Sequence, residues 1–143
     1  YLDAQWETTI PLSQNWHIHT GGRTGLLSGA PLPPFFYYLG GFNRNFINHF
    51  TSFPGLGFSE ITASQLLTAF LHLRYRINPY VYLLGGFQTA SFDSFPTSPL
   101  SHWHSMHSFM ASLLIDTPLG PLQLSGSTTQ HEARVYFNFG HWF

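Results

Sequence analysis

Apolar and polar residues alternate with a period of two along most of this chain, and this pattern limits the fold more than any other feature. In residues 65–77, QLLTAFLHLRYRI, one set of alternate residues is apolar. The other set includes His72, Arg74 and Arg76. Successive side chains of a β-strand point to opposite faces, so such a segment predicts a strand with one apolar and one polar face. No segment has a convincing helical period, and the sequence therefore predicts an all-β protein.

Seven strands of this kind are expected, and short and long connections alternate between them. The strands cover roughly residues 1–12, 15–27, 64–77, 80–91, 105–117, 120–128 and 132–143. An additional short strand between Phe35 and Leu39 is an alternative. The short connections are rich in turn-forming residues, whereas the long ones span about residues 28–63, 92–104 and 128–131. Strands of this length, with tight turns at one end and loops at the other, are typical of an antiparallel transmembrane β-barrel.

The composition helps to decide which face of these strands meets water. Only 8% of the residues are charged, lysine is absent and 18% are aromatic, whereas about 25% of the residues are charged in an average soluble domain. Alternation alone fits both a soluble β-sandwich and a membrane barrel with a polar lumen. The low charge and the aromatic strand ends, such as Trp6 and Trp142, favour the barrel. The expected lumen-facing residues are the polar members of the alternating pattern: His72, Arg74, Arg76, Asp116, Glu132, Arg134 and Asn138.

Several other classes of protein receive no support from the sequence. There is no cysteine, which excludes a disulfide framework and a thiolate metal site. A net charge of −1 gives no reason to expect a nucleic-acid partner. No apolar run approaches the roughly 18–20 residues of a membrane helix. The first residues do not resemble a signal peptide, so we expect that the chain begins after processing or within a longer parent protein.

The nine histidines raise the question of a metal site. His17 and His19 share one strand face, and the segment HWHSMH contains His102, His104 and His107. A functional zinc site needs three or four converging ligands, and nearby carboxylate ligands are not evident from the spacing. We therefore expect no metal and no other cofactor.

Catalytic motifs are missing as well. No G-x-S-x-G elbow, phosphate-binding loop or H-E-x-x-H pattern occurs. Ser28, Ser125 and Ser127 are interpreted as polar residues of strands or loops. The chain itself is therefore not expected to be an enzyme.

The C-terminal segment RVYFNFGHWF resembles the last strand by which outer-membrane barrels are recognised for assembly. That strand ends on an aromatic residue with alternating apolar residues before it. The matching residues here are Phe137, Phe139, Gly140 and Phe143. This resemblance implies that the barrel assembly machinery is a partner and that the chain is located in the bacterial outer membrane.

The order of the segments carries a more specific resemblance. YLGGFNRNF, the following irregular loop, DTPLGPLQLSGSTT and ARVYFNFGHWF are similar to the second half of the BamA-type outer-membrane superfamily, which includes bacterial surface antigens. Within it, the C-terminal barrels of bacterial patatin-like phospholipases look closest. The resemblance implies that residues 1–143 are a C-terminal barrel segment with a plug-like loop at about 28–63. It also implies that catalytic residues would belong to a separate upstream domain.

In that superfamily the loop after the glycine pair folds into the barrel and presents an Arg-Gly-aromatic tip. The matching plug-loop residues are Gly40, Gly41, Arg44, Asn45 and Phe46. Asparagine replaces the family glycine, and it tolerates the left-handed backbone that a tight turn requires. The candidate partners of the loop arginine are Glu60, Asp116 and Glu132; the alternative is a solvated arginine without a special partner.

Seven strands do not close a barrel, because bacterial outer-membrane barrels have even strand numbers from eight upward. N-terminal strands of the same parent, a second copy or a partner barrel would pair the open edges, and we favour the first; residues 35–39 as an eighth strand are a further alternative. The expected function is an outer-membrane module that anchors, or forms a plugged conduit for, a patatin-like domain. The alternatives are a protein secretion or insertion barrel, a soluble ligand-binding β-barrel or sandwich, and a histidine-based metal hydrolase.

Overall fold

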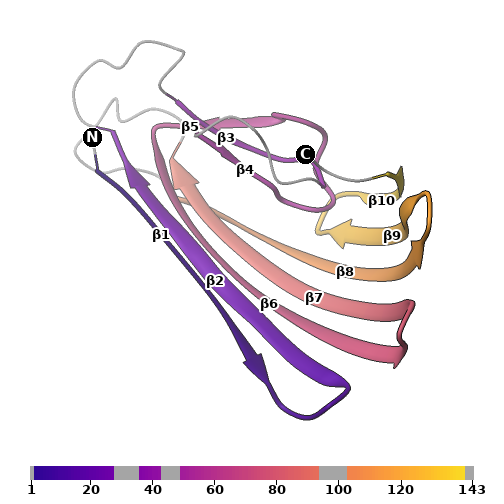
Figure 1. Cartoon of the computed structure of the whole chain (residues 1–143). Helices are drawn as coiled ribbons and strands as arrows, with labels where there is room; N and C mark the ends of the chain where they lie inside the picture. Colours follow the sequence, from indigo (N-terminus) through magenta and orange to yellow (C-terminus); the bar gives the residue numbers. More distant parts are fainter. Residues whose placement is uncertain (1, 28–35, 43–48, 94–102, 141–143) are drawn as a thin grey trace.

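The computed structural model describes residues 2–27, 36–42, 49–93 and 103–140. These residues form strands, turns and irregular segments, but no helix (Figure 1). Seven strands make one antiparallel sheet in the order β1-β2-β6-β7-β8-β9-β10. Their bounds are β1 Leu2–Pro11, β2 Trp16–Leu26, β6 Gln65–Asn78, β7 Val81–Asp93, β8 His104–Thr117, β9 Gly120–Thr129 and β10 Ala133–Phe139. Each of the seven predicted strands corresponds to one of these, which confirms the all-β fold and the antiparallel pairing.

A second, three-stranded sheet lies within the long connection between β2 and β6. Its strands are β3 Tyr37–Leu39, β4 Phe50–Thr51 and β5 Ile61–Ala63, in the order β4-β3-β5. The β3–β4 pairing is parallel and the β3–β5 pairing is antiparallel. The short strand expected near residues 35–39 therefore exists. Among the described residues it pairs only within this small sheet. The alternative prediction, that it is an eighth strand of the main sheet, is therefore wrong.

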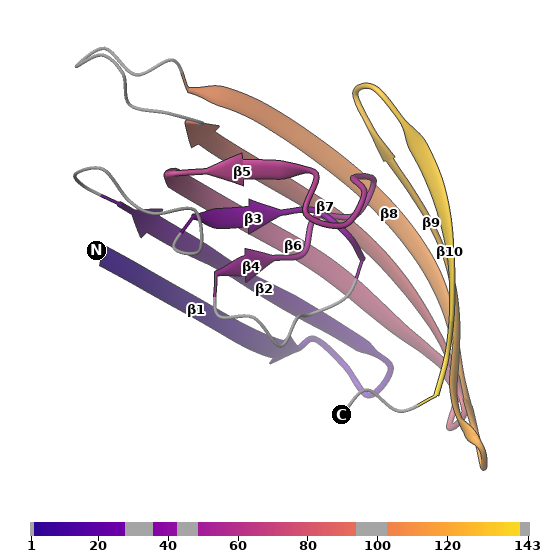
Figure 2. The ribbon, with the colours of Figure 1, turned by 90° about the horizontal axis from the view of Figure 1, so that it is seen from above.

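The small sheet covers one face of the large one. The large sheet is curved, and β3, β4 and β5 lie on its concave side (Figures 1 and 2). We call this face of the large sheet the inner face, the opposite one the outer face, and the described residues 36–42 and 49–63 the loop. Between the loop and the inner face lies the apolar core of the molecule. Its fully buried residues are Tyr37, Leu39, Phe53, Ala63, Leu66 and Ala90.

The outer face is apolar and uncovered. Among the described residues, large hydrophobic side chains of every strand of the main sheet are exposed, and they belong to the alternate set that points away from the loop. Examples on the outer face are Leu2, Trp6, Leu71, Leu83, Phe109, Leu124 and Val135. The apolar set of the sequence is thus the outer one, and the polar set is the one beneath the loop.

On the outer face, the row at which the exposed apolar residues begin shifts from β1 to β10. Leu2 on β1 lies in the same cross-strand row as Leu26 and Gln65. Val135 on β10 lies in the row of Leu73, which is eight residues further along β6 than Gln65. Eight residues of about 3.4 Å, over six strand spacings of about 4.8 Å, correspond to a slope of about 40°. Strands of outer-membrane barrels are tilted by a similar angle.

The described part of the large sheet is open. β1 and β10 are its two edge strands, and neither pairs with the other. The described strands therefore form a curved, open sheet, and the predicted barrel is not confirmed. No helix in the described ranges is long and apolar enough to cross a membrane.

Candidate functional site

Arg23 on β2 holds the start of β4 against the inner face. Its Nη1 donates to the carbonyl oxygen of Phe50 at 3.0 Å and to Thr51 Oγ1 at 3.3 Å. The same guanidinium pairs with both carboxylate oxygens of Asp3 on β1 and lies over the ring of Tyr37, 5.4 Å from its centroid. The side chains of Arg23 and Asp3 are 9% and 19% exposed. Charge-assisted, two-pronged contacts of this kind are among the stronger hydrogen bonds in proteins.

Two uncharged side chains of β7 and β8 hold the next part of the loop. Gln88 Nε2 donates to the carbonyl oxygen of Ser52 at 2.9 Å, and the Ser108 hydroxyl donates to the carbonyl oxygen of Pro54. Gln88 and Ser108 lie opposite each other in the β7–β8 register, and both are buried. The two strands thus present a pair of polar groups at the point where the loop passes over them.

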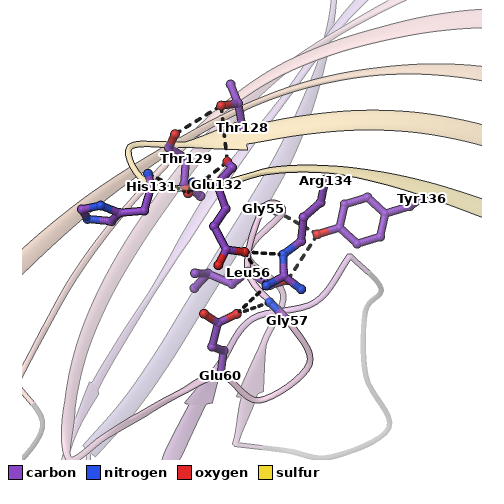
Figure 3. A network of polar contacts seen from close by, with 10 residues as sticks. All are labelled: Gly55, Leu56, Gly57, Glu60, Thr128, Thr129, His131, Glu132, Arg134 and Tyr136. Atoms are coloured by element: carbon purple, nitrogen blue, oxygen red, sulfur yellow. Dashed lines mark hydrogen bonds and ion pairs between the residues drawn. The ribbon is translucent and has the colours of Figure 1, made fainter.

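Tyr136 on β10 provides the third contact point (Figure 3). Its hydroxyl accepts a hydrogen bond from the Gly55 amide at 3.0 Å and donates to the carbonyl oxygen of Leu56 at 3.2 Å. The ring of Phe42 stacks on the Tyr136 ring, with 4.8 Å between the centroids. The Tyr136 side chain therefore holds both the turn at Gly55–Leu56 and the ring of Phe42.

An ion-pair cluster lies beside Tyr136 in Figure 3. Arg134 Nε donates to Glu132 Oε2 at 2.9 Å, and Arg134 Nη2 reaches Glu60 Oε2 of the loop at 3.3 Å. Glu60 also accepts a hydrogen bond from the Gly57 amide. The three charged side chains are between 35% and 48% exposed. Exposed ion pairs contribute only about 0–1 kcal/mol to stability, so this cluster is a weaker anchor than Arg23.

Apart from the Arg134–Glu60 ion pair and the Phe42–Tyr136 stack, most of these contacts share one feature: side chains of the inner face, which we call the wall, bind the main chain of the loop. An irregular segment has no neighbouring strand to pair with its carbonyl groups, and buried carbonyl groups need a partner. Here side chains of β2, β7, β8 and β10 provide it. The carbonyl groups that accept are every second one along the segment, those of Phe50, Ser52, Pro54 and Leu56.

Glycine allows the loop to approach the wall closely. A Cβ atom at Gly25 of β2 would lie 2.2 Å from the Tyr37 ring. Gly40 has a φ of 137°, and a Cβ there would lie 2.1 Å from the carbonyl oxygen of Gly57. Gly41 has a φ of 72°, which is also in the left-handed region. The predicted glycine pair is thus required by the backbone of the loop.

The other predicted plug-loop residues, Arg44, Asn45 and Phe46, lie outside the described residues. Two of the three partners considered for the loop arginine, Glu60 and Glu132, contact Arg134. The third, Asp116, lies near the β8–β9 turn, and its amide donates to the Tyr80 carbonyl oxygen.

The residues predicted to face a lumen lie on the inner face or at its rim. Among them, Arg134 contacts the loop, with its Nη2 3.3 Å from Glu60 Oε2. Arg74 lies over the Tyr82 ring at 4.1 Å, and Arg76 donates to the Gln14 carbonyl oxygen at 3.0 Å. These two arginines thus belong to the region near the short turns. The remaining residues of the prediction are His72, Asp116 and Asn138 on the inner face, and Glu132, which immediately precedes β10.

The predicted assembly residues Phe137 and Phe139 lie on the outer face and are exposed. Gly140 follows β10 with a φ of 105°. Phe143 lies outside the described residues.

Sequence reasoning missed most residues that anchor the loop: Arg23, Gln88, Ser108 and Tyr136. Arg23 and Tyr136 belong to polar alternate sets, and that signal places them on the correct face, whereas the alternation of β7 and β8 is too weak to place Gln88 and Ser108. Alternation does not say which residues meet the loop, because that depends on contacts between residues far apart in the chain.

The histidines do not form a metal centre in the described part of the chain, where no group of three or more ligand residues converges. His19 Nε2 lies 3.6 Å from Glu7 Oε2, and its ring centroid is 6.0 Å from that of His72. His104 and His107 are three residues apart on β8 and so point to opposite faces.

The fold and the site together define a class: a tilted antiparallel sheet with an apolar outer face and a loop anchored on its polar inner face. The chain belongs to the OMP85 superfamily, whose family model matches residues 1–143. No curated protein and no solved structure matches it. The family match confirms the superfamily expected from the order of the motifs.

Proteins of this superfamily are bacterial outer-membrane proteins that work in outer-membrane assembly and secretion. They are generally transport or assembly proteins rather than enzymes. Membership suggests an outer-membrane insertion or secretion barrel.

Proposed function

We propose that residues 1–143 are the C-terminal segment of an outer-membrane β-barrel, with a loop that plugs its polar interior. The burial pattern carries this proposal: the loop covers the charged face, whereas the large apolar side chains of the other face are uncovered among the described residues. A soluble two-layer protein would cover the apolar face and leave the charged face in water. Outer-membrane lipid is the partner that suits an uncovered apolar face.

The open edges need further strands, because an unpaired backbone group in hydrocarbon costs several kcal/mol. Successive strands of the sheet are antiparallel, so β1 and β10, the first and last of seven, point in the same direction. A second copy of this sheet in the same membrane orientation would join β10 to β1 in parallel. An all-antiparallel barrel instead requires an odd number of additional strands. We therefore favour upstream strands of the same parent over a second copy.

The loop, with Gly40 and Gly41 at its turn, acts as the plug, and its tip Arg44-Asn45-Phe46 faces the interior wall. The polar residues of the inner face then line the lumen. The C-terminal residues Phe137, Phe139, Gly140 and Phe143 serve as the signal for the barrel assembly machinery. These roles are supported by the resemblance of the segments and by the side of the sheet on which the described residues lie.

The module anchors, or forms a plugged conduit for, an associated patatin-like domain, and it is not catalytic itself. This specific role is supported by the segments LGGFNRNF, GPLQLS and FNFGHWF. Superfamily membership favours a second candidate, a barrel for protein secretion or insertion. The coding sequence upstream of Tyr1 separates the two, because a lipase domain supports the anchor and a series of periplasmic repeat domains supports secretion.

The membrane assignment itself is tested by fractionation of the parent protein after expression in a Gram-negative host. We expect the protein in the outer-membrane fraction, where it should resist extraction with alkaline carbonate. A monodisperse protein in the soluble fraction, without detergent, would contradict the proposal.

A further inference from the structure

We propose that the inner face of β2 and β6 carries, near the short turns, a binding site for a phosphate monoester group. The site consists of His17, Arg74 and Arg76, which we call the basic patch. The phosphate belongs to a lipid headgroup or to a small soluble ester. The inference rests on the proposed function, because the short turns of an outer-membrane barrel face the periplasm and the phosphate then comes from that side.

The three side chains of the basic patch are neighbours on the inner face. Thr68 on β6 lies opposite Arg23, the inner-face residue of β2 that contacts the loop. Arg74 and Arg76 are six and eight residues further along β6, so they point to the same face as Thr68. His17 lies opposite Arg74 in the β2–β6 register. Three nitrogen-bearing side chains thus gather over two adjacent strands.

A ligand can reach the basic patch. Arg74 and Arg76 are exposed, and His17 is half-buried. The six residues from Thr68 to Arg74 correspond to about 20 Å, so the patch lies well away from the point where Arg23 holds the loop. Within the described ranges no hydrogen bond or ion pair joins its side chains to the loop. The described part of the loop therefore leaves this region of the inner face uncovered.

The charge of the basic patch is not balanced by described residues of the protein. The other described arginines, Arg23 and Arg134, pair with carboxylates. In the described part of the chain, no carboxylate pairs with Arg74 or Arg76. The Cα atoms of these two arginines are about 6.8 Å apart on one face of a strand, and like charges at this distance repel each other. A bound anion offsets this repulsion.

The acidic residues of the neighbouring inner face do not take the place of such an anion. Glu7 on β1 has its Oε2 3.6 Å from His19 Nε2, and its Oε1 accepts a hydrogen bond from Gln5. Asp116 belongs to β8, two strands away from β6. Neither carboxylate therefore competes with a ligand for the two arginines.

The contacts of the two arginines hold the guanidinium groups but leave donors for a ligand. Arg74 lies over the Tyr82 ring, 4.1 Å from its centroid, and none of its side-chain N–H groups has an acceptor among the described residues. Arg76 Nη2 donates to the Gln14 carbonyl oxygen at 3.0 Å and to Asn15 Oδ1 at 3.5 Å. Its Nε and Nη1 groups remain available. Donors that are held in this way lose little freedom when a ligand binds.

A phosphate monoester suits these donors better than other ligands. Guanidinium groups bind phosphate and carboxylate oxygens through two parallel hydrogen bonds. A phosphate monoester has three acceptor oxygens and a charge of about −1.5 to −2 at pH 7, which matches two arginines, whereas a carboxylate has two oxygens and a single charge. The imidazole of His17 adds an N–H donor in either protonation state. Two fixed positive charges do not suit a metal cation.

The test is a titration of glycerol 3-phosphate with the purified parent protein in neutral detergent micelles, followed by the broadening of the ³¹P NMR signal. We expect wild type to bind it and the double variant Arg74→Gln/Arg76→Gln to bind about tenfold more weakly or less, since each guanidinium contributes charge-assisted hydrogen bonds. The matched control Arg134→Gln removes the same charge from the same face, where Glu132 and Glu60 already balance it. This control should bind like wild type.

Two further probes identify the source and the class of the ligand. Dihexanoyl phosphatidic acid carries the same phosphate on two short acyl chains. Tighter binding of this lipid than of glycerol 3-phosphate indicates a lipid headgroup, and equal binding of the two indicates a soluble ester. Acetate should bind more weakly than either, and acetate binding as tight as that of glycerol 3-phosphate overturns the assignment to phosphate.

Equal binding by wild type and the double variant overturns the proposal, and so does the absence of binding by wild type. If the double variant fails to fold, Arg74→Lys takes its place; it keeps the charge but loses the two-pronged contact, with an expected loss of about threefold. Insertion into lipid vesicles is measured on the same samples. An inserted protein that binds neither phosphate probe refutes the basic patch alone, whereas a protein that does not insert refutes the membrane function.

Discussion

At the scale of single residues, Arg23 is the charged side chain that we expect to stabilise the loop most. In the sequence it is simply one of several polar residues of an alternating strand. We expect Arg23→Ala to lower the free energy of unfolding by about 3–5 kcal/mol, because the mostly buried Asp3 carboxylate then loses both hydrogen bonds from the guanidinium. The Phe50 carbonyl also loses its donor. Urea-induced unfolding of the protein in lipid vesicles measures the loss. The control is Arg76→Ala: Arg76 is exposed, and its loss should cost less than about 1 kcal/mol. Equal losses for the two variants would contradict the role of Arg23.

Two glycines of the same sheet make a second residue-scale comparison. Gly25→Ala places a methyl group into the buried Tyr37 ring, 2.2 Å from its nearest atom, and overpacking of this kind costs about 1–3 kcal/mol. At Gly85 a Cβ would have no neighbour within 4 Å, so Gly85→Ala should leave the stability nearly unchanged. Thermal unfolding of both variants checks the difference. If Gly25→Ala is as stable as wild type, the Tyr37 ring does not pack on this strand.

At the scale of elements, the loop is held by different kinds of contact at Phe50–Thr51 and at Gly57–Glu60, and the two places should respond differently to salt. The Arg134–Glu60 pair is partly exposed, and salt screens exposed charges strongly, with a Debye length of about 3 Å at 1 M. The Arg23–Asp3 pair is mostly buried and should be screened much less. In 1 M NaCl we therefore expect faster amide hydrogen exchange around Gly57 than at low salt, with little change around Thr51. A uniform change along the loop would show that it is released as one unit.

The elements also show what the sequence can and cannot predict. The seven long strands follow from a period of two. In β6, for example, one face meets the loop and the other is apolar and uncovered, so apolar and polar residues alternate regularly along the sequence. The small sheet could not be derived in this way. Its strands β3 and β5 have three residues each and β4 has two, which is too short for a period to be detectable.

The contacts that anchor the loop were likewise predictable only in part. Alternation placed Arg23 and Tyr136 in the polar set, but the contact between Gly55 and Tyr136 joins residues 81 positions apart. Only the folded chain brings such residues together. The resemblance of its segment predicts Arg44 as the arginine of the loop, whereas the described arginines that hold the loop are Arg23 and Arg134.

At the scale of the whole molecule, the decisive property is which face of the sheet meets lipid, and two adjacent residues of β9 test it. Leu124 lies on the outer face and is 52% exposed, whereas Gln123 lies on the inner face opposite Asn138. In a membrane barrel an arginine near the midplane of the lipid face costs about 2–4 kcal/mol. Leu124→Arg should therefore lower the stability of the protein folded in lipid vesicles by about this amount, while Gln123→Arg, in a polar interior, should cost much less. In a soluble protein the exposed Leu124→Arg change would stay within about 0.5 kcal/mol. Urea titrations of both variants thus separate a membrane barrel from a soluble protein. If Leu124→Arg leaves the stability unchanged, the outer face does not meet lipid.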